Sequence, residues 1–149
     1  MVETDRPARI LLVEDNPGDV ILVRRSLADS GVDHELDVVE DGAAALAHLR
    51  REAPYRDALR PDLVLLDLNL PRVDGHQVLA TVKADPELVA IPVVVLTSSS
   101  ADADVRRAYE LHANAYLVKG FGLASLAESV RCVTEFWLRH VMLPAAVDG

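Results

Sequence analysis

The stretch DLVLLDLNLPRVDG, residues 62–75, decides the fold of this chain. Its apolar run, residues 63–66, is continuous rather than alternating, as in strands that are buried on both faces of a parallel sheet. Asp67 follows at once, and Asp74-Gly75 is a turn signal before an amphipathic segment. The stretch therefore predicts a buried strand that ends in a carboxylate and leads through a loop into a helix.

The same unit recurs on both sides of this stretch. Further apolar runs lie at residues 10–13, 36–39, 93–96 and 115–118, and amphipathic segments lie at 17–30, 43–51, 76–84, 103–111 and 123–139. Five strands that alternate with five helices predict an α/β fold, a doubly wound five-stranded parallel sheet of (βα)5 type with helices on both faces. By analogy with flavodoxin-like proteins of this architecture, we expect the strand order 2-1-3-4-5.

Length and composition set the organisation of the chain. A chain of 149 residues, half of them apolar, suits one globular domain, which we place at residues 9–139, between an N-terminal tail (1–8) and a C-terminal extension (140–149). No apolar run reaches some 18 residues, which argues against a membrane span, and we expect no membrane partner. The lone Cys132 excludes an internal disulfide and, with the polar N-terminus, predicts a cytoplasmic location.

Charge excludes one class of partner. The formal net charge is −9, whereas a protein that grips nucleic acid needs clustered lysine and arginine. The arginines fall in scattered pairs that suit solvated helix faces. We therefore expect no nucleic-acid partner.

Polar side chains follow four of the predicted strands. The first strand is followed by Glu14 and Asp15, the third by Asp67 and the fifth by Lys119, and the fourth ends in Thr97. Each residue alone has an ordinary explanation as a strand terminator, a helix cap or a solvated group. Because the carboxyl ends of parallel strands share one edge of a sheet, we expect all five side chains to meet there.

These residue types suit phosphoryl transfer. Clustered carboxylates repel one another unless a cation such as Mg²⁺ lies among them. Asp67 is then a carboxylate nucleophile, Lys119 neutralises charge, and Thr97 can hydrogen-bond a phosphoryl oxygen. Lysine occurs only at Lys83 and Lys119 in a chain with thirteen arginines, which suggests that the position of Lys119 calls for a compact ammonium.

Four ordered segments resemble the receiver domains of two-component response regulators. They are ILLVEDNP (10–17), DLVLLDLNLPRVDG (62–75), PVVVLTSS (92–99) and AYLVK (115–119), and the resemblance covers about residues 9–139. It implies a regulatory phosphoacceptor rather than an enzyme, although the domain would assist its own phosphotransfer and autodephosphorylation. The roles it implies are the phosphoacceptor for Asp67, the switch pair for Thr97 and Tyr116, and the Mg²⁺ site for Glu14 (through water), Asp15, Asp67 and Asn69 (through its backbone carbonyl).

A finer resemblance lies in YRDALRPDLVLLDLNLP and EFWLRHVMLP, which are similar to single-domain regulators encoded beside phytochrome-type histidine kinases. It implies a stand-alone receiver that takes a phosphoryl group from a phosphohistidine of a sensor histidine kinase, such as a bacteriophytochrome. Phosphorylation would then switch a protein-interaction surface.

One position departs from the family pattern. Receiver domains usually carry Lys-Pro with a cis peptide where this chain has Lys119-Gly120. A cis bond before glycine costs roughly 2.5–4 kcal/mol, so we expect a trans bond here. Residues 119–122 are then expected to follow a looser path, with higher mobility than the rest of the crevice.

The C-terminal segment carries more apolar residues than one inward-facing stripe needs. The additional ones are Phe136, Leu138, Val141, Met142 and Leu143. They favour a homodimer through the fourth helix, the fifth strand, the fifth helix and the C-terminal extension. The alternative is a tail that folds back over its own domain.

Three other functions are alternatives to the phosphoacceptor hypothesis. A phosphorylation-independent interaction module would be expected to lose Asp67 or Lys119, and both are present. An aspartate-nucleophile phosphatase of the haloacid dehalogenase type would carry a second acid at position 69, where this chain has asparagine. A flavodoxin-like electron carrier would need a phosphate cradle and more aromatic residues.

The five histidines show no metal-ligand spacing and are expected mostly at the surface, while Cys132 is expected in the core or an interface.

Overall fold

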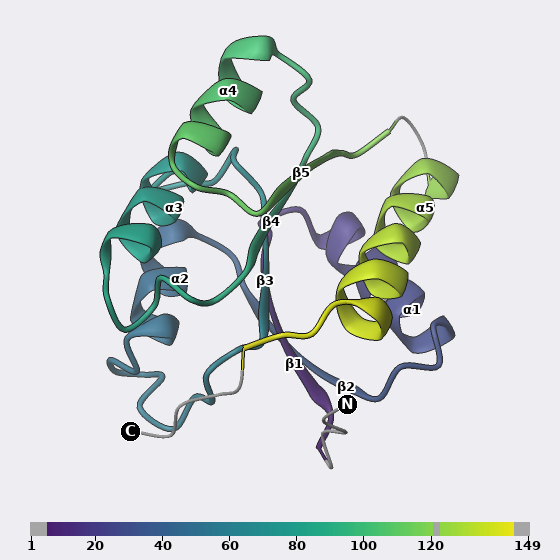
Figure 1. Cartoon of the computed structure of the whole chain (residues 1–149), viewed down its shortest axis with the longest axis horizontal. Coiled ribbons are helices and arrows are strands. Elements are labelled where there is room, and N and C mark those ends of the chain that lie inside the picture. The colour runs from purple at the N-terminus through teal and green to yellow at the C-terminus, as the bar shows by residue number, and fades with distance from the viewer. Residues whose placement is uncertain (1–5, 121–122, 145–149) are drawn as a thin grey trace.

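Five parallel strands form one sheet in the order β2-β1-β3-β4-β5, which confirms the predicted architecture (Figure 1). The computed structural model describes residues 6–120 and 123–144. The strands are β1 (Ala8–Val13), β2 (His34–Val39), β3 (Leu63–Leu66), β4 (Val93–Thr97) and β5 (Ala115–Val118).

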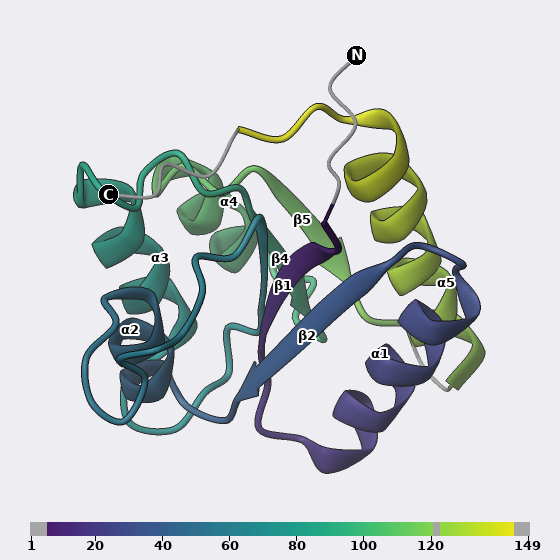
Figure 2. The ribbon, with the colours of Figure 1, turned by 90° about the horizontal axis from the view of Figure 1, so that it is seen from below.

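Helices cover both faces of the sheet. They are α1 (Pro17–Asp29), α2 (Gly42–Leu49), α3 (Gly75–Ala84), α4 (Asp102–Glu110) and α5 (Leu123–Val133), and α5 continues into a π-helical segment, η1 (Thr134–His140). Figures 1 and 2 show α2, α3 and α4 on one face and α1 and α5 on the other. The sheet is thus the middle of three layers.

Strand alternation divides the core into two hydrophobic clusters. Leu11 and Val13 of β1 pack toward α2, α3 and α4, whereas Ile10 and Leu12 of the same strand pack toward α1 and α5. All four side chains are at most 2% exposed. Burial on both faces explains why the apolar runs are continuous.

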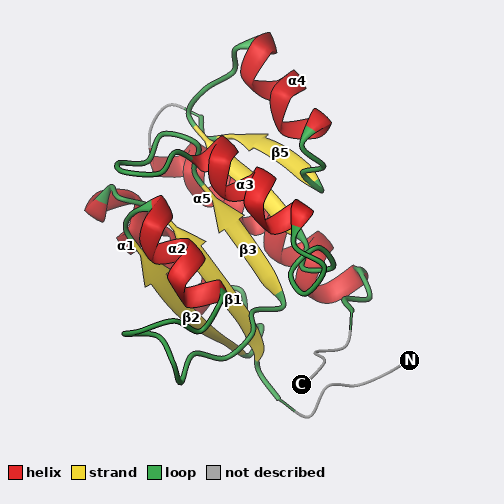
Figure 3. Ribbon diagram, turned by 90° about the vertical axis from the view of Figure 1, so that its left-hand side faces the viewer, coloured by secondary structure: helices red, strands yellow, loops and turns green. Residues whose placement is uncertain are grey.

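The strand order creates a crevice beside β1. β1 pairs with β2 on one side and with β3 on the other (Figure 3). Val13 of β1 lies opposite Leu66 of β3. The connections that follow β1 and β3 leave in opposite directions along the sheet, so the loops after these two strands diverge. This is the point at which doubly wound folds bind ligands.

Two local contacts fix these loops. Asn16 caps α1, since its side chain accepts hydrogen bonds from the backbone N–H groups of Gly18 and Asp19, with Pro17 at the first helical position. Gly75 begins α3 against the loop after β3, where a Cβ atom would lie 2.4 Å from the carbonyl oxygen of Asp67. The capped start of α1 and the absence of a side chain at Gly75 let the loops after β1 and β3 lie close to the sheet.

The C-terminal helix differs from the continuous α-helix predicted over residues 123–139. The α-helix ends at Val133, and the Thr134 hydroxyl donates to the carbonyl oxygen of Val130 at 2.8 Å. A hydroxyl that bonds the preceding turn competes with the backbone ladder, which accounts for the wider π turn. Arg139 then donates to the carbonyl oxygen of Ser30 and ties this segment to the end of α1.

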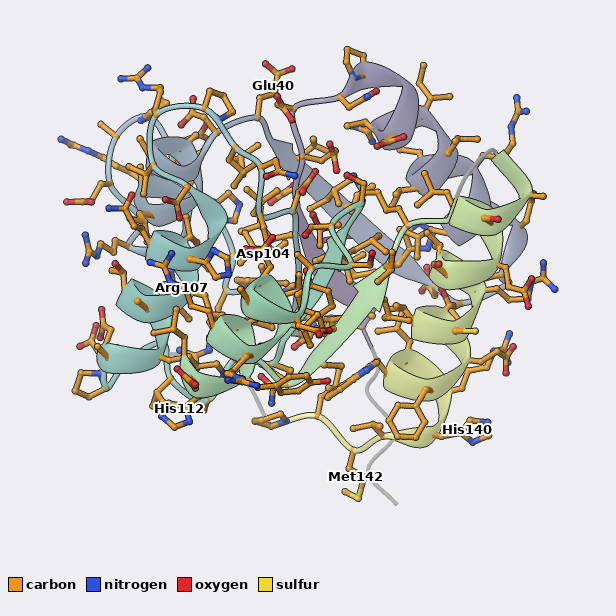
Figure 4. All side chains as sticks on the ribbon, turned by 90° about the horizontal axis from the view of Figure 1, so that it is seen from above. Glu40, Asp104, Arg107, His112, His140 and Met142 are labelled. Carbon is orange, nitrogen blue, oxygen red and sulfur yellow. The ribbon has the colours of Figure 1, made fainter. Side chains whose placement is uncertain are left out.

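Beyond η1 the chain runs back across the end of the sheet at which β1 begins (Figure 1). Met142 is 75% exposed and projects outward (Figure 4), whereas Val141 and Leu143 are half-buried. Most of the N-terminal tail (1–5), Phe121 and Gly122, and the end of the C-terminal extension (145–149) lie outside the described residues, so the expectations for them stay predictions.

The burial of three residues bears on the expectations for cysteine and histidine. Cys132 is exposed rather than in the core, because it lies on the outer side of α5 while Val130 and Val133 face inward, and its expected place in an interface stays a prediction. His48 and His76 are buried, at 4% and 7% exposure, rather than surface residues. His48 pairs with Asp37, and His76 lies against the first turn of α4.

Within residues 6–120 and 123–144, no helix is long and apolar enough to cross a membrane.

Candidate phosphoryl-transfer site

Three acids form one edge of the crevice. Glu14 and Asp15 follow β1 and Asp67 follows β3, and one carboxylate oxygen from each lies within 4.8 Å of the others. Glu14 and Asp67 are 2% and 7% exposed, while Asp15 is open to solvent. Two buried acids and one accessible acid therefore share a mouth that solvent and ligands can reach.

Asp67 lies at the centre of the hydrogen-bond network. Its Oδ1 accepts from the Thr97 hydroxyl at 2.9 Å and from the backbone N–H of Asn69 at 3.1 Å. Its Oδ2 accepts from the ammonium of Lys119 at 3.0 Å. Both oxygens are thus fixed by donors from the end of β4, from the residue that follows β5 and from the loop after β3.

The Lys119 ammonium contacts three carboxylates. Its Nζ lies 2.6 Å from Glu14 Oε2, 2.9 Å from Asp19 Oδ2 and 3.0 Å from Asp67 Oδ2. Its side chain is 9% exposed. The backbone N–H of Lys119 donates to the carbonyl oxygen of Thr97 at 2.7 Å, which holds the residue beside the end of β4.

Burial and charge move the pKa values of these groups in different directions. Burial is the largest influence on Glu14 and raises its pKa to about 7, with the Asp67 charge adding to the rise and Lys119 opposing it. Burial would also raise the pKa of Asp67, but the Lys119 charge and hydrogen bond hold that pKa below its usual value. Burial would lower the pKa of Lys119, but its bonds to Glu14 and Asp19 raise it instead. The ammonium and the Asp67 carboxylate are therefore an ion pair, and Glu14 takes up a proton more readily than an ordinary glutamate.

The donor set fits a hard divalent cation. Glu14, Asp15 and Asp67 offer oxygen ligands only, which is the chemistry that Mg²⁺ and related ions prefer. Among the described residues, three carboxylates contact the Lys119 ammonium and Asp15 lies beside two of them, so a further positive charge is electrostatically favoured.

A second network extends from the crevice to α4. Thr97 is fully buried, and Tyr116 lies half-buried on β5 with its hydroxyl donating to the carbonyl oxygen of Ser99 at 2.8 Å. The Ser99 hydroxyl donates to the carboxylate of Asp104. Asp104 lies in the first turn of α4 (Figure 4). The loop after β4 is thus bonded to both β5 and α4.

The structure brings together the side chains of five residues expected at this site, namely Glu14, Asp15, Asp67, Thr97 and Lys119. Tyr116 lies one network away, and Asn69 contributes a backbone N–H to Asp67. Among the described residues the cis peptide bond is Ala53–Pro54, so Lys119–Gly120 is not cis, as expected for glycine.

Sequence reasoning missed Asp19. Its carboxylate contacts Lys119 from the first turn of α1. The available signal was its spacing, four residues after Asp15 and three after the Asn16 cap, which directs it to the crevice side of the helix start.

The family follows from comparison with known proteins, since the response regulator receiver domain family matches residues 10–131. The chain belongs to this family. As a receiver domain it acts in two-component signal transduction. The response regulator Rcp1 of Synechocystis sp. is 49% identical to this receiver domain over 144 residues, which are 97% of this chain and 98% of Rcp1.

Solved structures of receiver domains agree. The Mn²⁺-bound form of Rcp1 superposes with a TM-score of 0.90 at 50% identity and covers 93% of this chain and 100% of that one. The phosphorylated cyanobacterial phytochrome response regulator RcpA also gives a TM-score of 0.90, at 48% identity, covering 93% of this chain and 99% of that one. The bacteriophytochrome response regulator AtBRR gives 0.72 at 38% identity and covers 97% and 99% of the two chains.

Proposed function

We propose that this receiver domain accepts a phosphoryl group from a phosphohistidine of a sensor histidine kinase onto Asp67 in a Mg²⁺-dependent reaction. The observation that carries the proposal is the fixing of both Asp67 oxygens, by Thr97 and Asn69 on one and Lys119 on the other, beside two further acids. A carboxylate held in this way is a positioned nucleophile in a charged crevice.

In the proposed transfer, an oxygen of the Asp67 carboxylate attacks phosphorus. A P–O bond forms, the P–N bond to the kinase histidine breaks, and its electron pair remains on the imidazole nitrogen. The product is an acyl phosphate, and Lys119 and Thr97 are close enough to donate to its phosphoryl oxygens. Slow attack of water on phosphorus would return Asp67 to its free form.

Asp15, Asp67 and the backbone carbonyl of Asn69 would hold the Mg²⁺, with Glu14 acting largely through water. The ion would supply charge neutralisation at the phosphoryl oxygens. The Mn²⁺-bound Rcp1 structure and a receiver domain of Pseudomonas aeruginosa with magnesium in its active-site cleft support this assignment.

Phosphorylation would switch the surface formed by α4 and β5. The Thr97 hydroxyl now bonded to Asp67 Oδ1 would turn to a phosphoryl oxygen, and the Tyr116–Ser99–Asp104 connection would carry the change to the start of α4. A shift between two arrangements of this loop would alter partner binding.

The proposed kinase partner is a bacteriophytochrome or a related sensor, because RcpA and AtBRR are named as phytochrome response regulators. The proposed output form is a homodimer through α4, β5, α5 and the C-terminal extension. Exposed apolar side chains on α4, on β5, on the η1 continuation of α5 and in the C-terminal extension support it, namely Tyr109, Val118, Phe136 and Met142. A cytoplasmic location accords with the single unpaired Cys132.

Beryllofluoride, which mimics a phosphoryl group, tests the proposed acceptor. We expect saturable, Mg²⁺-dependent binding to the wild-type protein, with NMR shifts near Thr97 and Tyr116, and no such binding to Asp67→Asn. A folded wild type that fails to bind would instead favour a phosphorylation-independent interaction module.

A further inference from the structure

Lys119 is held from two sides. Glu14 and Asp67 contact its ammonium from the loops after β1 and β3, and Asp19 contacts it from α1 at 2.9 Å. An ammonium has three N–H donors, so each carboxylate takes one. With two donors occupied by Glu14 and Asp19, the third is directed at Asp67.

Asp19 differs from the other two acids in one respect. Glu14 and Asp67 belong to the group of carboxylates that can share a cation, and Asp19 does not. A cation at that group would compete with Lys119 for Glu14 and Asp67. Asp19 would keep its contact with the ammonium, because its carboxylate is outside the group that would bind the cation.

The residue that follows Lys119 explains why its ammonium depends on such a side-chain contact. The residue that follows it is Gly120, where a Cβ atom would lie 2.4 Å from Cβ of Ser125. The Ser125 side chain therefore leaves no room for a Cβ atom at this position, and glycine lacks the fixed φ angle that proline would give the backbone after Lys119. Side-chain contacts have to fix the ammonium in place of a rigid Lys-Pro link.

The first turn of α1 is well placed to supply one of them. The Asn16 cap bonds the backbone N–H of Asp19 and Pro17 fixes the helix start, so the carboxylate projects from a rigid turn. The Asp19 side chain is 26% exposed, compared with 3% for the side chain of Glu14 and 8% for the side chain of Asp67. Asp19 thus lies at the outer side of the ammonium.

We propose that Asp19 is a positioning residue that directs the Lys119 ammonium at the phosphoryl group on Asp67, a role that rests on the proposed function. Asp19 forms no bond to phosphorus or to the cation. It acts through Lys119, by keeping one N–H donor occupied while another turns from Asp67 Oδ2 to a phosphoryl oxygen.

Electrostatics alone would give the opposite result. Asp19 is a negative charge near an incoming anion, so simple repulsion predicts tighter beryllofluoride binding when the charge is removed. Positioning predicts weaker binding. We expect Asp19→Asn to weaken Mg²⁺-dependent beryllofluoride binding and to slow phosphorylation by phosphoramidate, each by roughly tenfold, the scale of a hydrogen bond to a charged group.

Two further variants separate positioning from folding. Asp19→Glu restores the carboxylate and should recover most of the rate. Asp29→Asn makes the same charge change at the exposed far end of α1 and should leave beryllofluoride binding as in wild type. Mg²⁺ affinity, measured without beryllofluoride, should change by less than about threefold in Asp19→Asn, since Asp19 is not among the cation-binding carboxylates.

NMR of selectively labelled lysine gives a readout that a purely structural role would leave unchanged. The chain has two lysines, Lys83 and Lys119, so two sets of side-chain signals are expected. In wild type the two Hε protons of Lys119 should be distinct, and in Asp19→Asn they should average, while the signals of Lys83 stay unchanged.

The two proposals fail in different ways. If wild type binds no beryllofluoride, the phosphoacceptor function is wrong. If wild type binds it and Asp19→Asn binds equally well or better, with unchanged Lys119 signals, Asp19 has no positioning role and the phosphoacceptor function stands.

Discussion

Glu14 combines the smallest exposure in the carboxylate cluster with a pKa of about 7. The ordinary value is 4.5, so between these pH values the folded protein binds a proton here that the unfolded chain has released. The stability from this proton is complete below pH 4.5 and is lost as pH rises through about 7. Without divalent cations we expect the free energy of unfolding to fall from pH 5 to pH 8 by up to roughly 3 kcal/mol from this residue.

Urea unfolding at both pH values in a chelator, for wild type and Glu14→Gln, measures this contribution. The glutamine variant cannot titrate, so the wild type should lose more stability over the interval than the variant does. Asp67, whose pKa is lowered, acts below its ordinary value of 3.8 and leaves this window unaffected. Parallel pH profiles for the two proteins would show that Glu14 is not protonated in the fold.

At the scale of elements, the start of α3 lies against the loop that carries Asp67. A Cβ atom on Gly75 would lie 2.4 Å from the Asp67 carbonyl oxygen and 2.5 Å from Cα of Leu68, both backbone atoms that cannot turn aside. We expect Gly75→Ala to lower the free energy of unfolding by roughly 3 kcal/mol, the upper range for overpacking. Displacement of the loop should also weaken beryllofluoride binding. Chemical denaturation and titration of the same variant measure both effects.

Gly18→Ala is the matched control. The added Cβ would meet only the side-chain oxygen of Asn16, at 3.2 Å, and would lie within a helix that favours alanine. Its stability should stay within about 1 kcal/mol of wild type. Equal losses in the two variants would mean that the Gly75 contact is not special.

The elements were largely predictable because their signals are local. Continuous apolar runs identified the five strands, and Asn16-Pro17 identified the start of α1. The π segment after Val133 was not predictable, since it depends on whether the Thr134 hydroxyl turns to the backbone or to solvent. Asp19 was missed for a related reason: its spacing from Asp15 and Asn16 places it on the crevice side, but does not indicate a contact with Lys119, which is 100 positions away.

At the scale of the whole molecule, apolar side chains are exposed on the surface that we propose forms the dimer interface. Phe136 and Met142 are 58% and 75% exposed. We expect Phe136→Ser combined with Met142→Ser to shift a dimer toward monomer, because apolar contact area is removed from the interface. Light scattering over a range of protein concentrations measures the change.

Ile21→Ser is the control for this variant. Ile21 is 61% exposed on α1, outside the proposed interface, so its replacement should leave the oligomeric state as in wild type. If Ile21→Ser dissociates the protein and the double variant does not, the interface lies on α1 instead.

The crevice is assembled from pieces that lie far apart in the chain, since Lys119 and Glu14 are separated by 105 positions and β1, β3, β4 and β5 must all be in register. A partly folded chain therefore has no binding site, and a phosphoryl mimic binds the native population alone. By mass action, ligand at 100 times its Kd would add about 2.7 kcal/mol to the stability of the native state. A receiver with the phosphoryl mimic and its cation bound should therefore resist heat and proteases better than the free protein.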